Sequence, residues 1–238
     1  MQSTCAYYTN SKSLLVIRHT RSVLNEASFN KKNGLPYDRE LLEEHNDMAA
    51  GICSDGEAQA SITSRYIGPL ITSIEAEFTL GLTSTFPRTV QTKDRLLLPD
   101  SIVWKKRHAL REFDGGHQNE PRESWSLVFD RVDRIVKNDL ATMPQDTGAI
   151  IISHRGTMNV LRARIQGLKT KEAFEKARVL EVRRNADNCE IHQYETTEAG
   201  VFFRSHRAWR GDPGSIEERP VETIASEWIL IAPTTNQR

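Results

Sequence analysis

Short runs of consecutive apolar residues alternate along the chain with longer segments in which apolar residues recur every three or four positions. The first pattern is typical of buried strands, and the second of helices that bury one face. The apolar runs predict strands over residues 14–17, 79–84, 149–153 and 189–194, with a further pairing strand over 201–204. The periodic segments predict helices over residues 55–73 (with Ser54 as the N-cap), 88–98, 123–143, 157–166 and onward from 171. Strands that alternate with helices indicate an α/β fold, with helices on both faces of a sheet.

The helix predicted over residues 123–143 carries an apolar stripe at helical spacing. The stripe consists of Trp125, Val128, Val132, Ile135 and Leu140. We interpret it as core packing rather than as a binding surface. Residues 25–53, in contrast, are polar and broken by Asn-Gly and Leu-Pro pairs, which is typical of a loop or lid over a site.

Composition narrows the class of protein. The chain has 238 residues, with 32 Lys and Arg against 32 Asp and Glu, so its formal net charge is zero. This argues against a nucleic-acid binder with a basic surface and against a binder of anionic membranes. The three cysteines, Cys5, Cys53 and Cys189, are widely spaced, which indicates reduced thiols rather than a disulfide framework or a zinc site. The N-terminal stretch lacks a signal-peptide pattern and no apolar run is long enough to span a membrane, so we expect a cytoplasmic protein.

Candidate chemistry is concentrated where the predicted strands end. The sequence contains no GxxxxGK[ST], GxGxxG, HExxH or GxSxG motif. Three predicted strands instead run into cationic or titratable residues: Arg18-His19 after residues 14–17, Arg88 after 79–84, and His154 after 149–153. Ligands of open α/β sheets bind outside the carboxyl ends of the strands. Folding could therefore bring two arginines and two histidines around one point.

Such a pocket suits a dianionic phosphoryl group. The guanidinium groups of Arg18 and Arg88 would neutralise the phosphate, and a neutral imidazole nitrogen between them would attack phosphorus to give a covalent intermediate. Because fixed cations stabilise the phosphoryl oxygens in the transition state, this chemistry requires no magnesium. The leaving alkoxide still needs a proton, for which Glu112 is the candidate and Asp114 the reserve.

The same residues resemble the motifs of the histidine phosphatase (phosphoglycerate mutase-like) superfamily, in the family's order and over about residues 14–194. The matching residues are Arg18, His19, Ser22 and Asn25 in the first block, Ser84, Arg88, Gln91 and Thr92 in the second, Leu110 and Glu112 in the third, and Ser153, His154, Thr157 and Met158 in the fourth. Residues 55–60 and 188–191 resemble the family's G-x-x-Q-A helix start and its asparagine-led final strand. The stretch after Glu112 looks closest to the broad acid-phosphatase-like branch, because the basic, tyrosine-containing stretch of the mutase branch is not found there.

This resemblance implies a fold and a set of residue roles. The fold would be a three-layer α/β/α sandwich around a mixed, mostly parallel sheet. Residues 1–238 would form a single domain with lid-like insertions at about 25–53 and 112–140 and a C-terminal extension at about 207–238. His19 would be the phosphorylated nucleophile. The other site residues would be Arg18, Arg88 and His154, which complete the phosphate pocket, Asn25, which contacts the phosphate, and Glu112, the proton donor. Neither a metal nor a cofactor would be needed, and the partner would be a small phosphorylated substrate rather than nucleic acid or a membrane.

Three residues depart from the family's pattern. Thr20 stands where glycine is usual, which would be strained at a positive φ and harmless at a negative one. Arg155 replaces the glycine after the second histidine, and Asn159 replaces an arginine one turn on. The extra guanidinium of Arg155 could attract a second phosphate or a carboxylate on the substrate, or it could fold over the site and block it.

These residues predict a phosphomonoester hydrolase that acts through a phosphohistidine without metal. A nearby alternative is a phosphoglycerate mutase-like enzyme, which would return the phosphoryl group to a substrate. An alternative from another class is a catalytically weak homologue that binds phosphorylated ligands or protein partners, which Thr20 and Arg155 keep open.

Overall fold

A computed structural model of the chain describes residues 13–43, 48–113, 123–165, 187–197 and 200–206. The strands are β1 (Ser13–Arg18), β2 (Glu77–Thr83), β3 (Val103–Lys106), β4 (Thr147–Ser153), β5 (Ile191–Thr197) and β6 (Gly200–His206). The helices are α1 (Val23–Lys32), α2 (Arg39–Glu43), α3 (Ser54–Ser73), α4 (Pro87–Arg95), the 3₁₀ turn η1 (His108–Leu110), α5 (Trp125–Ile135), its π-helical continuation η2 (Val136–Leu140) and α6 (Arg155–Ile165).

The six strands form one sheet in the order β3-β2-β4-β1-β5-β6. β3, β2, β4 and β1 are parallel, whereas β5 and β6 pair antiparallel. The sheet is therefore mixed and mostly parallel, and the predicted α/β fold class is confirmed.

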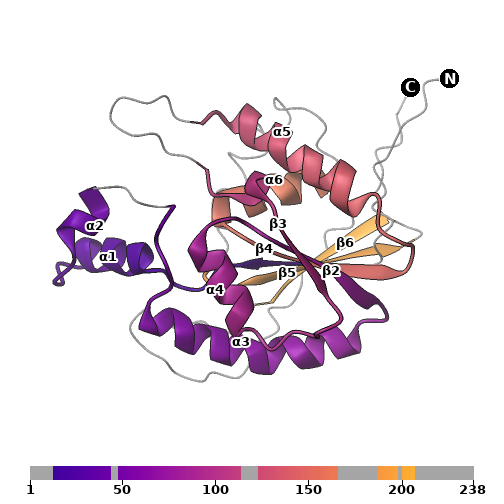
Figure 1. Cartoon of the computed structure of the whole chain (residues 1–238), viewed down its shortest axis with the longest axis horizontal. Coiled ribbons are helices and arrows are strands. Elements are labelled where there is room, and N and C mark those ends of the chain that lie inside the picture. The colour runs from indigo at the N-terminus through magenta and orange to yellow at the C-terminus, as the bar shows by residue number, and fades with distance from the viewer. Residues whose placement is uncertain (1–12, 44–47, 114–122, 166–186, 198–199, 207–238) are drawn as a thin grey trace.

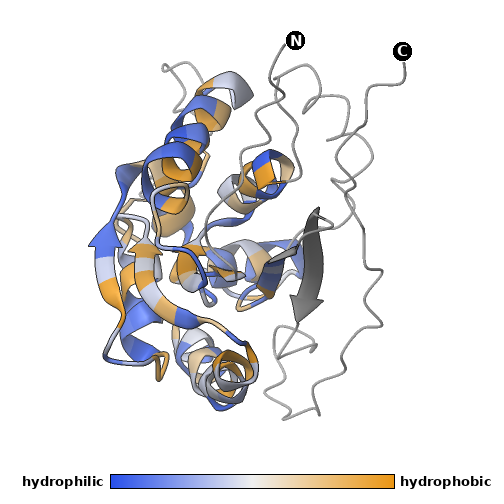
Figure 2. Ribbon diagram, turned by 90° about the vertical axis from the view of Figure 1, so that its right-hand side faces the viewer, coloured by the Kyte–Doolittle hydropathy of each residue, from blue (hydrophilic) through white to orange (hydrophobic). Residues whose placement is uncertain are grey.

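Helices cover both faces of the sheet (Figure 1), α5 and α6 on one face and α3 and α4 on the other. Side chains of β1 alternate between the two resulting cores: Leu14 and Val16 join the core under α5 and α6, and Leu15 and Ile17 join the core over α3. A strand buried on both faces needs apolar residues at every position, which explains the continuous run at residues 14–17. In Figure 2, hydrophobic and hydrophilic residues alternate along the helices, as expected for elements that each bury one face.

The stripe predicted as core packing behaves as expected. Val128, Val132 and Ile135 on α5 and Leu140 on η2 are buried in the first core, and Trp125 packs against it. Arg131 lies on the same buried side of α5 and is only 2% exposed. A buried arginine in an apolar stripe must be paired with partners inside the protein.

Several predicted boundaries were wrong by a few residues, for local reasons. Ser54 is the first residue of α3, and the N-cap is Cys53, whose backbone N–H is tied to the Arg21 carbonyl at 3.1 Å. α4 begins at Pro87 and ends at Arg95 rather than spanning residues 88–98, and α6 begins at Arg155 rather than at residue 157. The strand predicted from residue 189 begins at Ile191, because Cys189 adopts a left-handed backbone with φ of 61°.

Other segments contain elements that were not predicted, or lie outside the residues that the structure describes. Residues 25–53 contain most of α1 and all of α2, and their lid role stays a prediction, as does that of residues 112–140. β3 was missed because its sequence, VWKK, is charged and largely exposed at the sheet edge. The helix predicted from residue 171, Asp114 and residues 207–238 lie outside the described residues. No helix within the described ranges is both long and apolar enough to cross a membrane.

Candidate active site

The site is built where three parallel strands end at the same level. Arg18 is the last residue of β1 and pairs in register with Ser153, the last residue of β4. Thr83, the last residue of β2, pairs with Ile152, one residue before Ser153. His19, Ser84 and His154 follow directly, and backbone hydrogen bonds join His19 N–H to the Ser153 carbonyl (3.0 Å) and Ser84 N–H to the Ile152 carbonyl (3.2 Å). The register therefore brings the predicted strand-end residues together.

His19 is held in one tautomer. Its Nδ1 lies 2.6 Å from the backbone carbonyl of Thr20, an acceptor only, so Nδ1 carries the proton. On the other side of the ring, Arg88 Nε–H donates to Nε2 at 3.2 Å. Because the Arg88 group only donates, Nε2 presents its lone pair. This nitrogen is the one available to act as a nucleophile.

Burial and two cations keep this imidazole neutral. His19 is 3% exposed, and burial, followed by the charges of Arg88 and Arg18, holds its pKa well below the usual range of histidine. The backbone hydrogen bond to Thr20 opposes this shift without overcoming it. A protonated imidazole has no free lone pair, so the lowered pKa extends the range of pH over which the lone pair of His19 Nε2 is available.

His154 packs edge-on against His19, with ring centroids 5.0 Å apart. Its Nε2 is hydrogen-bonded to Ser84 Oγ at 3.0 Å, and Phe86 packs against its ring. Burial, then the charges of His19 and Arg88, lowers the pKa of His154 well below the usual range. Its buried Nδ1 has no hydrogen-bond partner among the described residues.

Two arginines give the site its positive charge. Arg88 is 2% exposed and packs over the Phe86 ring, 4.9 Å from its centroid. Burial, then the nearby charge of Arg155, lowers the pKa of Arg18 to about 10, while Glu112 acts in the opposite direction. The guanidinium group of Arg18 is charged at neutral pH, so positive charge lies beside the neutral imidazole of His19.

Glu112 is fixed at the beginning of α6. Its Oε1 accepts hydrogen bonds from the backbone N–H groups of Phe113 (2.9 Å) and Gly156 (3.1 Å). A Cβ at position 156 would lie 2.6 Å from this oxygen, so glycine is needed there for the carboxylate to approach. The carboxylate is thereby bonded to the residue that follows Arg155, and its negative charge raises the pKa of Arg18.

The segment that carries Glu112 is held from the other side by Arg131. One terminal nitrogen of Arg131, Nη1, donates to the carbonyls of Ala109 (2.5 Å) and Arg111 (2.8 Å), and Nη2 donates to that of Glu112 (3.3 Å). Glu123 neutralises Arg131 through contacts of 2.9 and 3.1 Å. Sequence reasoning missed this positioning residue, although an arginine within an apolar helical stripe was a signal for it.

Asn25 contributes through a capping box. It is the N3 residue of α1, where Ser22 is the N-cap, and each side chain accepts a hydrogen bond from the other's backbone N–H at 3.2 Å. Asn188 then joins α1 to the site: its Nδ2 donates to Asn25 Oδ1 (3.2 Å) and to the carbonyl of His19 (2.9 Å). Asn188 had no predicted role, although it begins the asparagine-led stretch. Contact of Asn25 with a phosphate stays a prediction.

Thr20 is accommodated without strain. Among the described residues other than glycine, only Asp146 and Cys189 have a positive φ. The Thr20 backbone N–H donates to Thr92 Oγ1 at 3.0 Å, and its side chain lies beside Gly56. Replacement of the usual glycine is therefore harmless to the backbone here.

Arg155 stands at the first residue of α6 and is exposed. It makes no hydrogen bond or ion pair with the residues that the structure describes, yet its charge is the largest electrostatic influence on Arg18. Arg155 therefore adds a third cation to the site, and it forms no ion pair with a carboxylate of the described residues.

No three His, Cys, Asp or Glu side chains within the described ranges are arranged to hold a metal ion. The side chains that gather at the strand ends are instead cations and neutral imidazoles, which suit an anionic ligand.

The sequence matches no protein-family model and no curated protein. Solved structures do match. Alpha-ribazole phosphatase from Shigella flexneri has a TM-score of 0.56 at 17% identity, over 79% of this chain and 93% of that one. A mycobacterial glucosyl-3-phosphoglycerate phosphatase in complex with VO3 has a TM-score of 0.53 at 15% identity, over 85% and 100% of the two chains. The product of open reading frame Rv3214 of Mycobacterium tuberculosis has a TM-score of 0.56 at 17% identity, over 80% and 94%.

These structural neighbours are members of the histidine phosphatase superfamily. The chain therefore has the phosphoglycerate mutase-like fold, and the fold expected from the sequence motifs is confirmed.

Proposed function

We propose that this chain is a phosphomonoester hydrolase that works through a phosphohistidine on His19. The observation that carries the proposal is the state of that residue. A buried, neutral imidazole presents the lone pair of Nε2 to Arg88, under the charge of Arg18, at the carboxyl ends of parallel strands. Phosphatases among the structural neighbours support the same class of reaction.

In the first step, Nε2 of His19 attacks phosphorus and the bond from phosphorus to the ester oxygen breaks. Arg18 and Arg88 neutralise the phosphoryl oxygens, which replace Nε2 as the acceptor for Arg88 Nε–H. The proton on Nδ1 stays with the Thr20 carbonyl, so the positive charge that develops on the ring is shared with that acceptor. These preorganised cations do the work that a divalent metal does in other phosphoryl transfers.

Glu112 completes both steps as an acid and then a base. Its carboxylic acid form protonates the leaving alkoxide, and the resulting carboxylate takes a proton from the water that attacks the phosphohistidine. Inorganic phosphate then leaves, and His19 returns to its neutral form. Two backbone hydrogen bonds to Oε1 fix the orientation of the carboxyl group for this exchange.

Hydrolysis of p-nitrophenyl phosphate in excess EDTA tests the proposal. We expect turnover by the wild type, inhibition by vanadate, and loss of turnover in His19→Ala with its circular dichroism unchanged. Arg65→Ala, which changes an exposed arginine on α3, is the control and should retain activity. A wild type that is inert on this ester and on sugar, glycerate and nucleotide monophosphates contradicts the proposal.

Detection of the intermediate separates the alternatives. Glu112→Gln cannot activate water, while p-nitrophenolate leaves with little need of a proton, so this variant should accumulate an acid-labile, base-stable phosphoenzyme. Transfer of labelled phosphate to a second substrate with little release to water would favour a mutase. Vanadate binding without any turnover would favour the phospho-ligand-binding homologue.

A further inference from the structure

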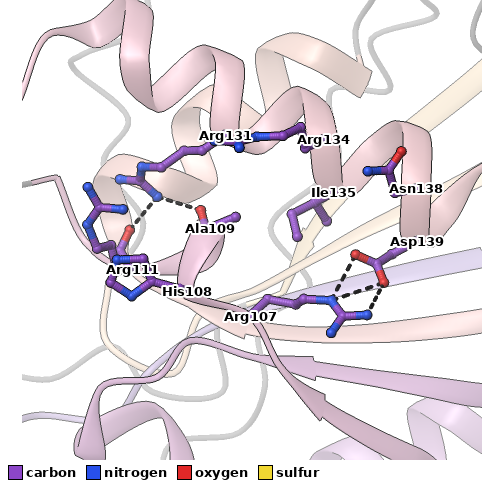
Figure 3. Close-up of a pocket in the computed structure, with 9 residues that line it drawn as sticks. All are labelled: Arg107, His108, Ala109, Arg111, Arg131, Arg134, Ile135, Asn138 and Asp139. Atoms are coloured by element: carbon purple, nitrogen blue, oxygen red, sulfur yellow. Dashed lines mark hydrogen bonds and ion pairs between the residues drawn. The ribbon is translucent and has the colours of Figure 1, made fainter.

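A second pocket, of about 400 Å³, lies between the segment that follows β3 and the helices α5 and η2. Figure 3 shows Arg131 and Arg134 along the α5 side, Arg107 and Arg111 on the opposite side, and Ile135 between them. A volume of this size lies within the range of small-ligand sites, about 300–1,000 Å³.

The pocket is separate from the candidate active site. None of the strand-end residues lines it. The segment from Ala109 to Glu112 lies between the two: its carbonyls face Arg131 on the pocket side, while the Glu112 carboxylate bonds to the first turn of α6. A ligand in the pocket therefore meets a different set of side chains from a substrate at His19.

The charges in and around the pocket do not balance. Asp139 engages Arg107 through contacts of 2.7 and 3.1 Å, and Glu123 engages Arg111 at 2.9 Å and Arg131 at 2.9 Å. Three guanidinium groups thus share two carboxylates, and with Arg134 the four arginines carry two more positive charges than these carboxylates balance among the described residues. Arg134 has no hydrogen bond or ion pair with any residue in the described ranges, and it is exposed.

We propose that this pocket is a second, non-catalytic binding site for a phosphate-bearing dianion. Two uncompensated charges match the dianion of a phosphate monoester, and guanidinium groups bind two phosphate oxygens at once. Arg134 and Arg111 would make the main contacts, because Nε and Nη2 of Arg107 are already hydrogen-bonded to Asp139. The volume beyond one phosphate would hold an organic group against Ile135 and the Ala109 segment. The inference does not depend on the catalytic activity proposed for His19.

The test is an NMR titration of the ¹⁵N-labelled full chain with inorganic phosphate, in an Arg88→Ala background that weakens the candidate active site. We expect saturable shifts of the amide resonances of residues 107–111 and 134–139. The additional change Arg134→Ala should weaken this binding about tenfold, since it removes a charged partner, whereas Arg65→Ala should leave it unchanged. Arg134 and Arg65 are both exposed, so both variants should fold as well as their Arg88→Ala parent.

Two outcomes overturn the proposal. One is the absence of saturable shifts in these segments, and the other is equal, weak shifts in the Arg134→Ala and Arg65→Ala variants, which indicate an adventitious ion only. A parallel titration with phenylphosphonate, which no phosphatase can hydrolyse, identifies the ligand type. Tighter binding than inorganic phosphate assigns the site to organic phosphates, and equal binding assigns it to inorganic phosphate.

Discussion

Two arginine clusters lie on either side of the segment that carries Glu112, and they are built in opposite ways. At the strand ends, Arg18 and Arg88 surround two buried imidazoles that their charges help to keep neutral. Beneath α5, Arg131 and Arg107 are matched to the carboxylates of Glu123 and Asp139.

Arg131 and Arg107 are structural in this comparison, whereas Arg18 and Arg88 lie in the candidate active site. A cation matched by a carboxylate of the same chain stabilises the fold, and breaking the pair leaves a buried charge uncompensated. The charges that act on Arg18 are mixed, two arginines (Arg155 and Arg88) and two carboxylates (Glu112 and Asp187), and the three guanidinium groups can also attract an anion that arrives from outside. Replacing arginines in the two clusters should therefore affect different properties of the protein.

The largest effect is expected from Arg131→Met. This change leaves Glu123 buried without its main partner and removes the donor to the carbonyls of Ala109 and Glu112, so the free energy of unfolding should fall by about 3–5 kcal/mol. Urea denaturation measures it. Arg134→Met, on the same helix but exposed, should change stability by less than about 0.5 kcal/mol. Equal losses of stability in the two variants would show that the pairing of Arg131 with Glu123 does not stabilise the fold.

Arg88→Met should show the reverse pattern. Loss of one preorganised donor to the phosphoryl group should lower kcat/KM for p-nitrophenyl phosphate by about 10²–10³-fold. Stability should fall far less than in Arg131→Met, because the change also removes repulsion between Arg88 and Arg18. Kinetics and urea denaturation on the same preparation test both halves, and a stability loss as large as that of Arg131→Met would contradict the assignment of Arg88 to the site.

The two buried histidines should give stability a dependence on pH. Their pKa values are lowered in the folded state, so below about pH 6.5 the unfolded chain binds more protons than the folded one, and stability falls with falling pH. His154→Gln removes one such proton, which should reduce the slope between about pH 6 and pH 5 by up to 1.4 kcal/mol per pH unit. Urea denaturation at several pH values measures the slopes, and identical slopes would show that His154 is not held neutral.

The smallest effect concerns Arg155. As an exposed cation beside Arg18, it should favour substrates with a second negative group, so Arg155→Gln should lower kcat/KM for 3-phosphoglycerate about five- to tenfold while p-nitrophenyl phosphate is affected less. Higher activity on both substrates would instead show that Arg155 blocks the site.

The runs of apolar residues were enough to predict most of the buried strands of the sheet. Strands buried on both faces, such as β1 and β4, need continuous apolar sequences, and the motifs that follow them name the residues at their ends. β3 was not predictable by this reasoning, because an exposed edge strand can be charged. The start of α3 was also not predictable in this way, because the hydrogen bond from Cys53 N–H to the Arg21 carbonyl does not depend on the hydrophobicity of either side chain.

The candidate site was predictable in its charged side chains but not in what orients them. His19, Arg18, Arg88, Glu112 and His154 are all named by motif and strand-end position. The contacts that fix them come largely from the backbone, including the Thr20 carbonyl on Nδ1 and the Gly156 N–H on Glu112. Asn188 reaches the site only through the return of the chain in β5, which a local pattern does not encode.

The carbonyl of Thr20 has a consequence for how such chains diverge. The group that sets the tautomer of His19 belongs to the backbone, and every amino acid supplies it equally. With φ negative, the constraint on the side chain is only the space between Gly56 and Thr92. The side chain at position 20 can therefore differ from the usual glycine while the hydrogen bond to His19 Nδ1 is kept. A search that requires the exact motif would miss such a chain.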